Sequence, residues 1–329
     1  MYAIRLHAFG PAENLLHEQT DDPVPAPGQV RIAVAAAGVH LLDTHLREGR
    51  PGPYRSTTGE LPTIPGREIA GTVEALGDGT DPSWLGRPVV AHIGMAPGGY
   101  AELTVVDAAK LHPIPEGLSP AEAVAMIGTG RTTLGILQYT DLGPHSVAVV
   151  TAAAGGIGTL LVQYAKNAGA TVIGLAGGPA KTARVTANGA DLAVDYTLPD
   201  WPRHVRAHLD ALGRRATVVH DSVGGNTARA AVDLLGEGGL HLVHGNSGGQ
   251  ALSLSEEELT ARGITSRNVL GPAMIEKGGG IRALETRALA EAAAGRLRPA
   301  VTRFPLAEAA AAHRALETRG TVGKVVLVP

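Results

Sequence analysis

The chain has no cysteine among its 329 residues, so it can form no disulfide and offers no thiolate to a zinc ion. Aromatic residues make up only 3% of the chain, which leaves valine, leucine, isoleucine and alanine to fill its interior. Neither sign of charge dominates, because the formal net charge is −3 and the arginines are scattered. This balance gives no reason to expect a nucleic acid or an anionic membrane surface as a partner.

Long apolar runs are also missing, since no stretch approaches the roughly 18 consecutive apolar residues of a membrane span. The opening segment, MYAIRLHAFGPAENLL, lacks the apolar centre and small-residue cleavage site of a secretory signal. We therefore expect no membrane association and a cytoplasmic location. The chain is instead rich in glycine (44) and proline (22), and its hydrophobic fraction of 44% and its length predict a turn-rich globular protein of two domains.

The first third of the chain is typical of short strands separated by turns. The stretch QVRIAVAAAGV (29–39) alternates in polarity, and the other expected strands are IAGTVEALG (69–77), RPVVAHI (87–93) and YAELTVVD (100–107). At Ser119 the pattern changes, because Ser119, Pro120 and Glu122 form the start signal of a helix.

The middle of the chain alternates short apolar strands with helical stretches of about ten residues, which predicts a parallel sheet covered by helices on both faces. These expected strands are SVAVVTAA (146–153), TVIGLA (171–176), LAVDY (192–196), ATVVHDSVGG (216–225) and GLHLVHGNSGG (239–249).

The turn AAAGGIG (152–158) joins the first of these strands to a helix. Gly155 would let the backbone approach a pyrophosphate, and Gly158 would let the helix pack closely on the strand. The helix N-terminus adds amide donors for the anion. Ala153 replaces the first glycine of the dinucleotide fingerprint, so the strand, helix and second strand around the turn supply the context that identifies it.

No acidic residue occurs between Thr159 and Ala190. Domains that bind NAD place an acid about 20 residues after the glycines to hold the ribose hydroxyls, and a carboxylate there would repel a 2′-phosphate. This chain has LAGGPAK at that position, with Lys181 and Arg184 following. The pattern favours NADP over NAD, although the two cations could simply solvate a helix face.

With these motifs in view, the chain resembles the medium-chain dehydrogenase/reductase superfamily, and within it the zinc-free quinone oxidoreductase branch that includes ζ-crystallin. The resemblance spans essentially the whole chain and rests on PGREIAGTVEALG (65–77), the glycine turn, HDSVGG (220–225), HGNSGG (244–249) and the closing segment from 295 to 329. It implies an α/β fold with a GroES-like, mostly β catalytic domain (1–120 and 266–329) and a doubly wound Rossmann domain (121–265) that binds NADP.

The resemblance also implies particular cofactor contacts and a homodimer. Lys181 and Tyr196 would face the adenosine 2′-phosphate beside Gly177, although Gly178 replaces the serine that often precedes the lysine. The remaining positions implied to contact the cofactor are Thr132, Ala154, Gly155, Gly156, Ile157, Gly158, Asn246 and Ser247.

Zinc enzymes of the superfamily carry a cysteine and a histidine in segments that here read GVH and GRE, giving His40 and Arg67. An arginine at a ligand position repels a cation, so we expect no metal, with a residual site of His40, Glu68 and another histidine as the alternative.

Without a Lewis acid the substrate should accept hydride readily, as a quinone or an activated alkene does. The candidate catalytic residues are His40, Asp43 and His45, with Tyr54 and Arg67 as further polar groups. A histidine could donate a proton to the reduced substrate oxygen. Alternatively, His45 could point to solvent while Asp43 braces its loop.

These patterns predict an NADPH-dependent quinone reductase. An enoyl or enone reductase and a non-catalytic NADPH-binding protein are the alternative hypotheses.

Overall fold

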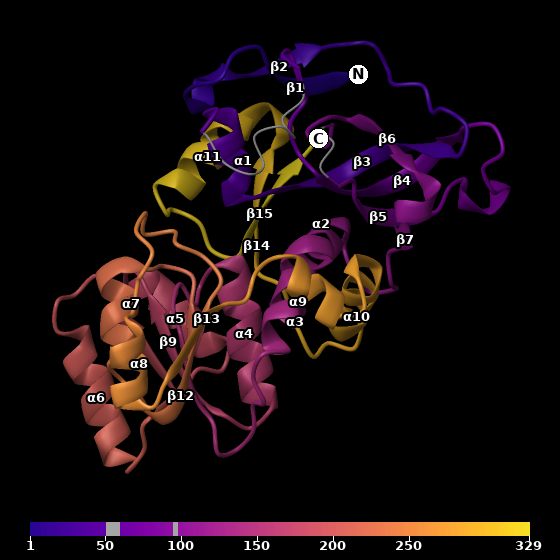
Figure 1. Ribbon diagram of the computed structural model, residues 1–329. Coiled ribbons are helices and arrows are strands. Elements are labelled where there is room, and N and C mark those ends of the chain that lie inside the picture. Colours follow the sequence, from indigo (N-terminus) through magenta and orange to yellow (C-terminus); the bar gives the residue numbers. More distant parts are fainter. Residues whose placement is uncertain (51–59, 95–97) are drawn as a thin grey trace. The chain divides into compact units, whose positions relative to one another are not determined.

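The computed structural model describes residues 1–50, 60–94 and 98–329, and the chain divides into two compact units (Figure 1). Unit 1 comprises Met1–Thr129, Ala288–Ala293 and Pro299–Pro329, and unit 2 comprises Gly130–Arg287 and Ala294–Arg298. The described residues include no helix that is both long and apolar enough to cross a membrane.

Unit 1 is built on a mainly antiparallel sheet in the order β14-β15-β3-β4-β5-β7, with β6 paired to β3 and a separate β1-β2 hairpin. The C-terminal strand β15 lies antiparallel to β3, so both ends of the chain complete this unit. Its strands are β1 (Tyr2–Leu6), β2 (Leu15–Gln19), β3 (Gln29–Val39), β4 (Glu68–Leu76), β5 (Pro88–His92), β6 (Leu103–Asp107), β7 (His112–Pro113), β14 (Val301–Pro305) and β15 (Lys324–Val328). Its helices are α1 (Leu41–Arg47), α2 (Pro120–Ala125) and α11 (Ala309–Glu317).

Unit 2 contains a six-stranded, wholly parallel sheet in the order β10-β9-β8-β11-β12-β13. All four residues of β8 are buried, as expected for a strand covered on both faces. The strands are β8 (Val147–Val150), β9 (Thr171–Ala176), β10 (Leu192–Asp195), β11 (Ala216–Asp221), β12 (Leu235–Val243) and β13 (Thr265–Asn268). The helices are α3 (Arg131–Leu137), α4 (Gly156–Asn167), α5 (Pro179–Ala187), α6 (Trp201–Ala211), α7 (Gly225–Val232), α8 (Glu256–Arg262) and α9 (Pro272–Lys277), while α10 (Ile281–Ala293) spans the division between the units.

The two units divide the chain at positions other than the expected domain boundaries at 121 and 266. Residues 121–129 belong to unit 1, and residues 266–287 belong to unit 2. The second shift has a clear cause, because β13 pairs in parallel with β12 and so becomes the sixth strand of the Rossmann-like sheet.

The helix start predicted at Ser119 is confirmed, but the helix is not continuous. Ser119 and Glu122 form a capping box at the start of α2, in which the Ser119 amide donates to the Glu122 carboxylate at 2.9 Å. A π-helical turn over Met126–Gly130 then separates α2 from α3. At its centre, a Cβ on Gly128 would lie 1.5 Å from Glu68 Oε1, so the buried glutamate requires a glycine in this turn.

The glycine turn before α4 is packed around one carbonyl group. Ala152 adopts a left-handed conformation (φ 45°), and its carbonyl oxygen accepts the Gly155 amide at 2.9 Å. A Cβ on Gly158 would lie 2.3 Å from that oxygen and 2.7 Å from Ala153 Cα. Helix α4 therefore approaches β8 closely only because residue 158 has no side chain.

This packing predicts that Gly158→Ala destabilises unit 2 by about 1–3 kcal/mol, the range typical of an overpacked site. The free energy of unfolding would be measured with urea through the fluorescence of Trp201, which is buried in the core of unit 2, in a Trp84→Phe background. Gly155→Ala is the matched control and should change stability by less than about 1 kcal/mol, because its nearest neighbour would be 3.2 Å away. Equal losses in the two variants would contradict the close-packing argument.

Candidate functional site

The carboxyl ends of the parallel strands in unit 2 meet at one edge of the sheet, which we call the strand-end edge. The turn at 151–158 follows β8, Gly177 follows β9, and Tyr196 follows β10. Asn246 and Ser247 lie in the loop after β12. The topology thus gathers at one edge all the expected cofactor-binding residues except Thr132, which lies half-buried on α3, and Lys181 in the first turn of α5.

The start of α4 is arranged to receive an anion. Gly155 is its N-cap and makes no side-chain cap hydrogen bond, so no side chain from this residue occupies the helix end. The helix continues for 12 residues, and its N-terminus carries amide donors and the positive end of the helix dipole. Such an end can receive a pyrophosphate, because Gly155 and Gly156 at its start carry no side chains.

The segment directly after β9 carries no acid at the place where an NAD site has one. Gly177 and Gly178 occupy this position, and a Cβ on Gly177 would lie 3.4 Å from Thr197 Cγ2 and 3.9 Å from the Tyr196 hydroxyl. The Tyr196 phenol therefore lies beside Gly177. Arg184 is exposed on α5, one turn beyond Lys181.

The loop after β12 is tied to the loop after β11. The amide and the hydroxyl of Ser247 both donate to the Ser222 carbonyl, at 2.9 and 3.0 Å. The Asp221 carboxylate accepts the amides of Val223 and Gly224 at 2.9 and 3.0 Å. These bonds order the far part of the strand-end edge.

Two buried histidines that the sequence patterns assign to no role lie at the ends of neighbouring strands of this sheet. His220, at the end of β11, and His244, after β12, are both buried with ring centroids 6.4 Å apart. Neither ring has a hydrogen-bond partner among the described residues. Burial lowers the pKa of His220 to about 3 and that of His244 to about 4, so both are neutral near pH 7.

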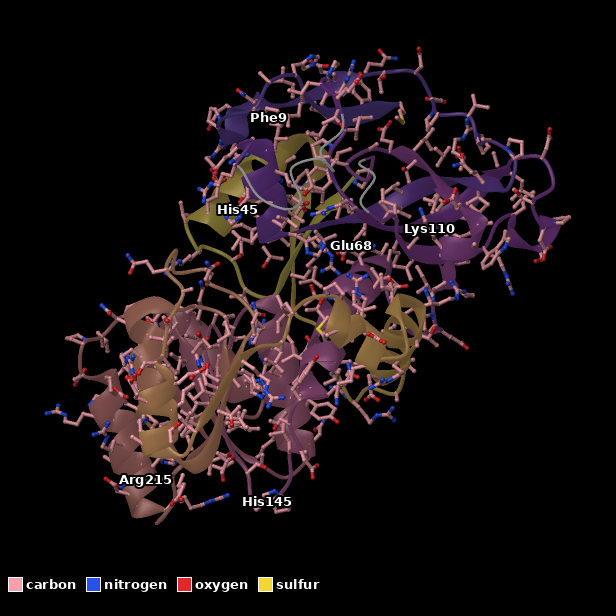
Figure 2. The ribbon with its side chains drawn as sticks, viewed as in Figure 1. Phe9, His45, Glu68, Lys110, His145 and Arg215 are labelled. Carbon is pink, nitrogen blue, oxygen red and sulfur yellow. The ribbon has the colours of Figure 1, made fainter. Side chains whose placement is uncertain are left out.

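In unit 1 a second polar group surrounds Glu68, the fully buried first residue of β4 (Figure 2). Its Oε2 atom lies 2.8 Å from His40 Nε2 and 2.9 Å from Lys324 Nζ, and these two nitrogens are 3.0 Å apart. We call these three residues the Glu68 cluster. Burial acts to raise the pKa of Glu68, but the neighbouring His40 and Lys324 outweigh it and hold that pKa well below its usual range.

Asp43 belongs to a separate buried network with Arg67, Tyr100 and His313. Its Oδ1 atom accepts from Arg67 at 3.0 Å, and its Oδ2 accepts the Tyr100 hydroxyl at 3.1 Å and the His40 amide at 2.7 Å. The phenol oxygen lies 3.3 Å from His313 Nε2, whose pKa burial lowers to about 4. Burial acts to raise the pKa of Asp43, yet the charges of His40 and Arg67 leave it lowered.

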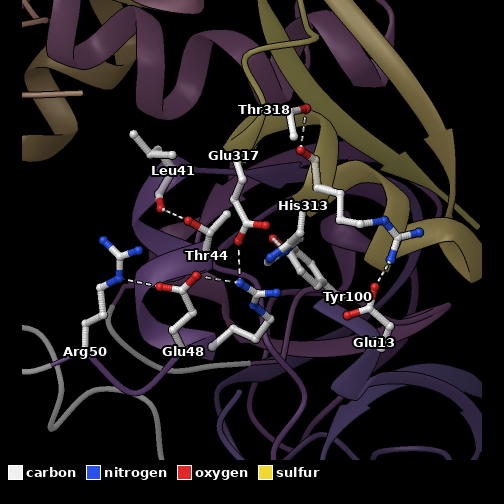
Figure 3. A network of polar contacts seen from close by, with 11 residues as sticks. Glu13, Leu41, Thr44, Glu48, Arg50, Tyr100, His313, Glu317 and Thr318 are labelled. Carbon is white, nitrogen blue, oxygen red and sulfur yellow. Dashed lines mark hydrogen bonds and ion pairs between the residues drawn. The ribbon is translucent and has the colours of Figure 1, made fainter. Parts of the chain in front are cut away.

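His45 lies apart from both groups, in the last turn of α1 (Figure 2). Nearby, Arg47 forms the ion pair with Glu317 that links α1 to α11, and it also contacts Glu48. Figure 3 shows Glu317 and Glu48 in this network. Partial burial and the nearby Arg50 lower the pKa of His45. Of the three expected catalytic residues, His40 and Asp43 are thus joined by a backbone hydrogen bond and His45 lies apart from both, while both oxygens of Asp43 are already engaged within unit 1. Tyr54 lies outside the described residues.

The sequence reasoning missed Lys324, Tyr100 and His313, which supply most of this polar chemistry. One signal for Lys324 exists, because it is the single charged residue in the otherwise apolar closing strand KVVLV. Tyr100 and His313 carry no such signal, since their contact joins positions 213 apart.

A mainly antiparallel β unit completed by both chain ends, together with a doubly wound parallel sheet bearing a glycine turn, defines the medium-chain dehydrogenases and reductases. Two family descriptions match the chain, "Alcohol dehydrogenase GroES-like domain" over residues 26–116 and "Zinc-binding dehydrogenase" over residues 188–327. The predicted fold class, a GroES-like domain with a Rossmann domain, is confirmed.

Full-length relatives narrow the class. The chain is 32% identical to a 2-haloacrylate reductase of a Burkholderia species over 98% of both chains, and 32% identical to a quinone oxidoreductase of Pseudomonas aeruginosa over 99% of both. Among solved structures it is similar to Escherichia coli quinone oxidoreductase complexed with NADPH (TM-score 0.84, 28% identity) and to an NAD-dependent alcohol dehydrogenase (TM-score 0.86, 29% identity), each over 100% of both chains. The chain belongs to the quinone oxidoreductase branch of the medium-chain dehydrogenase/reductase superfamily, and it is an oxidoreductase.

The zinc named in one family description does not fit the residues at the corresponding place. A zinc site needs three protein ligands. Here the Lys324 ammonium lies within 3.0 Å of both the His40 ring nitrogen and the Glu68 carboxylate, where it opposes a second cation. Among the residues that the structure describes, no three His, Asp or Glu side chains are grouped so as to hold a metal ion.

The buried histidines predict that unit 2 loses stability in acid. Their pKa values lie below the ordinary histidine value of about 6.5, so below about pH 6.5 the unfolded chain binds protons that the folded chain does not. The contribution of the two neutral histidines to the free energy of unfolding is therefore fully present above about pH 6.5, and it is lost as the pH falls toward 4. His220→Leu should reduce the slope of stability against pH by up to about 1.4 kcal/mol per pH unit in urea titrations followed by Trp201 fluorescence.

At pH 7 the same His220→Leu variant should be at least as stable as the parent, because it removes an unpartnered polar ring. His220→Asn is the matched control, since it removes the titration but keeps a polar group, and it should flatten the slope without the gain at pH 7. A slope unchanged in both variants would show that His220 does not titrate on unfolding.

The Glu68 cluster predicts that Lys324→Met destabilises unit 1 by about 3–5 kcal/mol, because it leaves a buried carboxylate without its ammonium. Urea unfolding followed through Trp84 fluorescence in a Trp201→Phe background measures the loss. The double variant Glu68→Gln/Lys324→Met should recover a large part of it, since the uncompensated charge is gone. A loss as large in the double variant as in the single one would show that packing of the lysine stem, and not its charge, stabilises the strand.

Proposed function

We propose that the protein is an NADPH-dependent, zinc-independent reductase that transfers hydride to a quinone-like acceptor. The observation that carries this proposal is the glycine pair Gly177–Gly178 at the end of β9, beside Tyr196 and close to Lys181. An acid at this place would bind the ribose hydroxyls of NAD, and its replacement by glycine leaves room for a 2′-phosphate. The relative solved with NADPH supports the same cofactor.

The residues of the strand-end edge would hold NADPH, which supplies the hydride when bound. Ala154 to Gly158 would receive the pyrophosphate at the start of α4, and Lys181 with Tyr196 would receive the 2′-phosphate. The rest of the cofactor would contact Asn246, Ser247 and Thr132. The Ser247–Ser222 bonds keep the loop after β12 in place for this role.

The choice of acceptor is inferred from the Lys324 ammonium, which opposes a metal ion beside His40 and Glu68 in the described part of unit 1. An unactivated ketone needs its oxygen polarised, whereas a quinone accepts hydride without a Lewis acid. His40 is 28% exposed and is held by Glu68 and Asp43, so it is the candidate proton donor to the reduced oxygen. Asp43 would position His40 through the backbone, and His45 stands as a second candidate.

An activated alkene is the second candidate substrate. The 2-haloacrylate reductase among the relatives acts, by its name, on an α,β-unsaturated carboxylate. The same chemistry applies, with hydride added to the β-carbon and a proton to the α-carbon. Turnover of a 1,4-quinone, an enone and 2-chloroacrylate with NADPH, followed by its absorbance at 340 nm, separates the two.

A homodimer and a cytoplasmic location complete the proposal. Both are implied by the resemblance and by the composition of the chain, and both remain predictions. Size-exclusion chromatography with light scattering tests the first.

The cofactor assignment predicts that quinone reduction is faster with NADPH than with NADH. Lys181→Met should raise KM for NADPH about tenfold, because it removes a charge-assisted contact to the phosphate, and should leave KM for NADH unchanged. Arg184→Met, which removes a cation exposed on the same helix, is the control and should have a smaller effect. Equal use of both cofactors by the parent enzyme would overturn the assignment.

A further inference from the structure

Asp195, the last residue of β10, places a carboxylate beside the site expected to receive the 2′-phosphate. It lies opposite Ala176 in the β9–β10 pairing, one residue before Gly177. The segment from Thr159 to Ala190 contains no acidic residue, but an acid from the next strand, Asp195, lies beside it in the fold. Sequence spacing does not reveal this, because the residue lies beyond the segment in which the ribose-binding acid is sought.

The carboxylate is fixed in place by three donors. Asp195 Oδ1 accepts the Thr197 hydroxyl at 2.6 Å and the Thr197 amide at 2.9 Å. The Gly178 amide donates to the same carboxylate. The hydroxyl of Thr197, with Gly178 and the Thr197 amide, lowers the pKa of Asp195, so it is an anion at neutral pH.

Two consequences follow for an incoming phosphate. Gly178 is the N-cap of α5, and its amide already serves the carboxylate, so it is not available to a phosphate oxygen. The fixed negative charge also repels a dianion bound between Tyr196 and Lys181. NADH has no 2′-phosphate, so it neither needs the Gly178 amide nor is repelled by the Asp195 carboxylate.

We propose that Asp195 is a specificity-determining residue that limits the preference for NADPH over NADH by opposing the 2′-phosphate. This inference rests on the proposed NADPH site and adds to it a residue that acts against the phosphate. With Asp195 present, the enzyme prefers NADPH over NADH less strongly than the glycine pair and Lys181 alone would make it.

The test measures binding of two probes to the full-length enzyme by calorimetry at low salt. Adenosine 2′,5′-bisphosphate carries the 2′-phosphate, and 5′-AMP lacks it. Asp195→Asn keeps an oxygen that can accept from Thr197 and removes the charge. It should tighten binding of the bisphosphate about fivefold and leave 5′-AMP binding within twofold, and the gain should shrink at 0.5 M salt because screening weakens the repulsion in the parent.

Thr197→Val is the matched control, because it removes one donor to the carboxylate and keeps the charge. It should not tighten bisphosphate binding, so a gain equal to that of Asp195→Asn would assign the effect to loop geometry and overturn the proposal. Unchanged affinity of Asp195→Asn for the bisphosphate would also overturn it. If the parent enzyme binds the bisphosphate no better than 5′-AMP, and Asp195→Asn does the same, the NADPH site itself is disproved.

Discussion

Glu68 is a carboxylate with no exposed surface, and the groups that neutralise it come from both ends of unit 1. Lys324 belongs to the last strand of the chain, and His40 lies 284 positions earlier, directly after β3. A buried charge without a partner costs several kcal/mol, so the closing strand is fixed to the N-terminal sheet by electrostatics as well as by its ladder with β3. The backbone adapts to the same group, since Gly38 and Gly128 both leave room for the Glu68 oxygens.

The same arrangement disfavours a metal ion at that place, because the Lys324 ammonium already lies beside His40 and Glu68. In a zinc enzyme a dication and its ligands would satisfy the local negative charge. Here the Lys324 ammonium, which is part of the fold, balances the charge of the Glu68 carboxylate. Under the proposed function, the Glu68 cluster would act through hydrogen-bond donors and proton transfer, which suits acceptors that are electrophilic on their own.

The sequence predicted those features that depend on local pattern. Strand β3 was expected at 29–39 and is found there, and the Ser119 capping box forms as its residues indicate. The convergence of the cofactor loops also followed, because parallel strands place their carboxyl ends at one edge. The π turn at Met126–Gly130, the Glu68 cluster and the position of Asp195 beside Gly178 did not follow, since each depends on side chains brought together from distant segments.

Gly158 lies against the Ala152 carbonyl for a reason that involves no ligand. The missing side chain is demanded by the distance between α4 and β8, whether or not a dinucleotide is present. Gly158 therefore indicates close packing of a helix on the preceding strand and turn. A protein of this fold that had lost its cofactor would still need the glycine. Evidence for the ligand itself lies about twenty residues later, in the groups that would face the ribose.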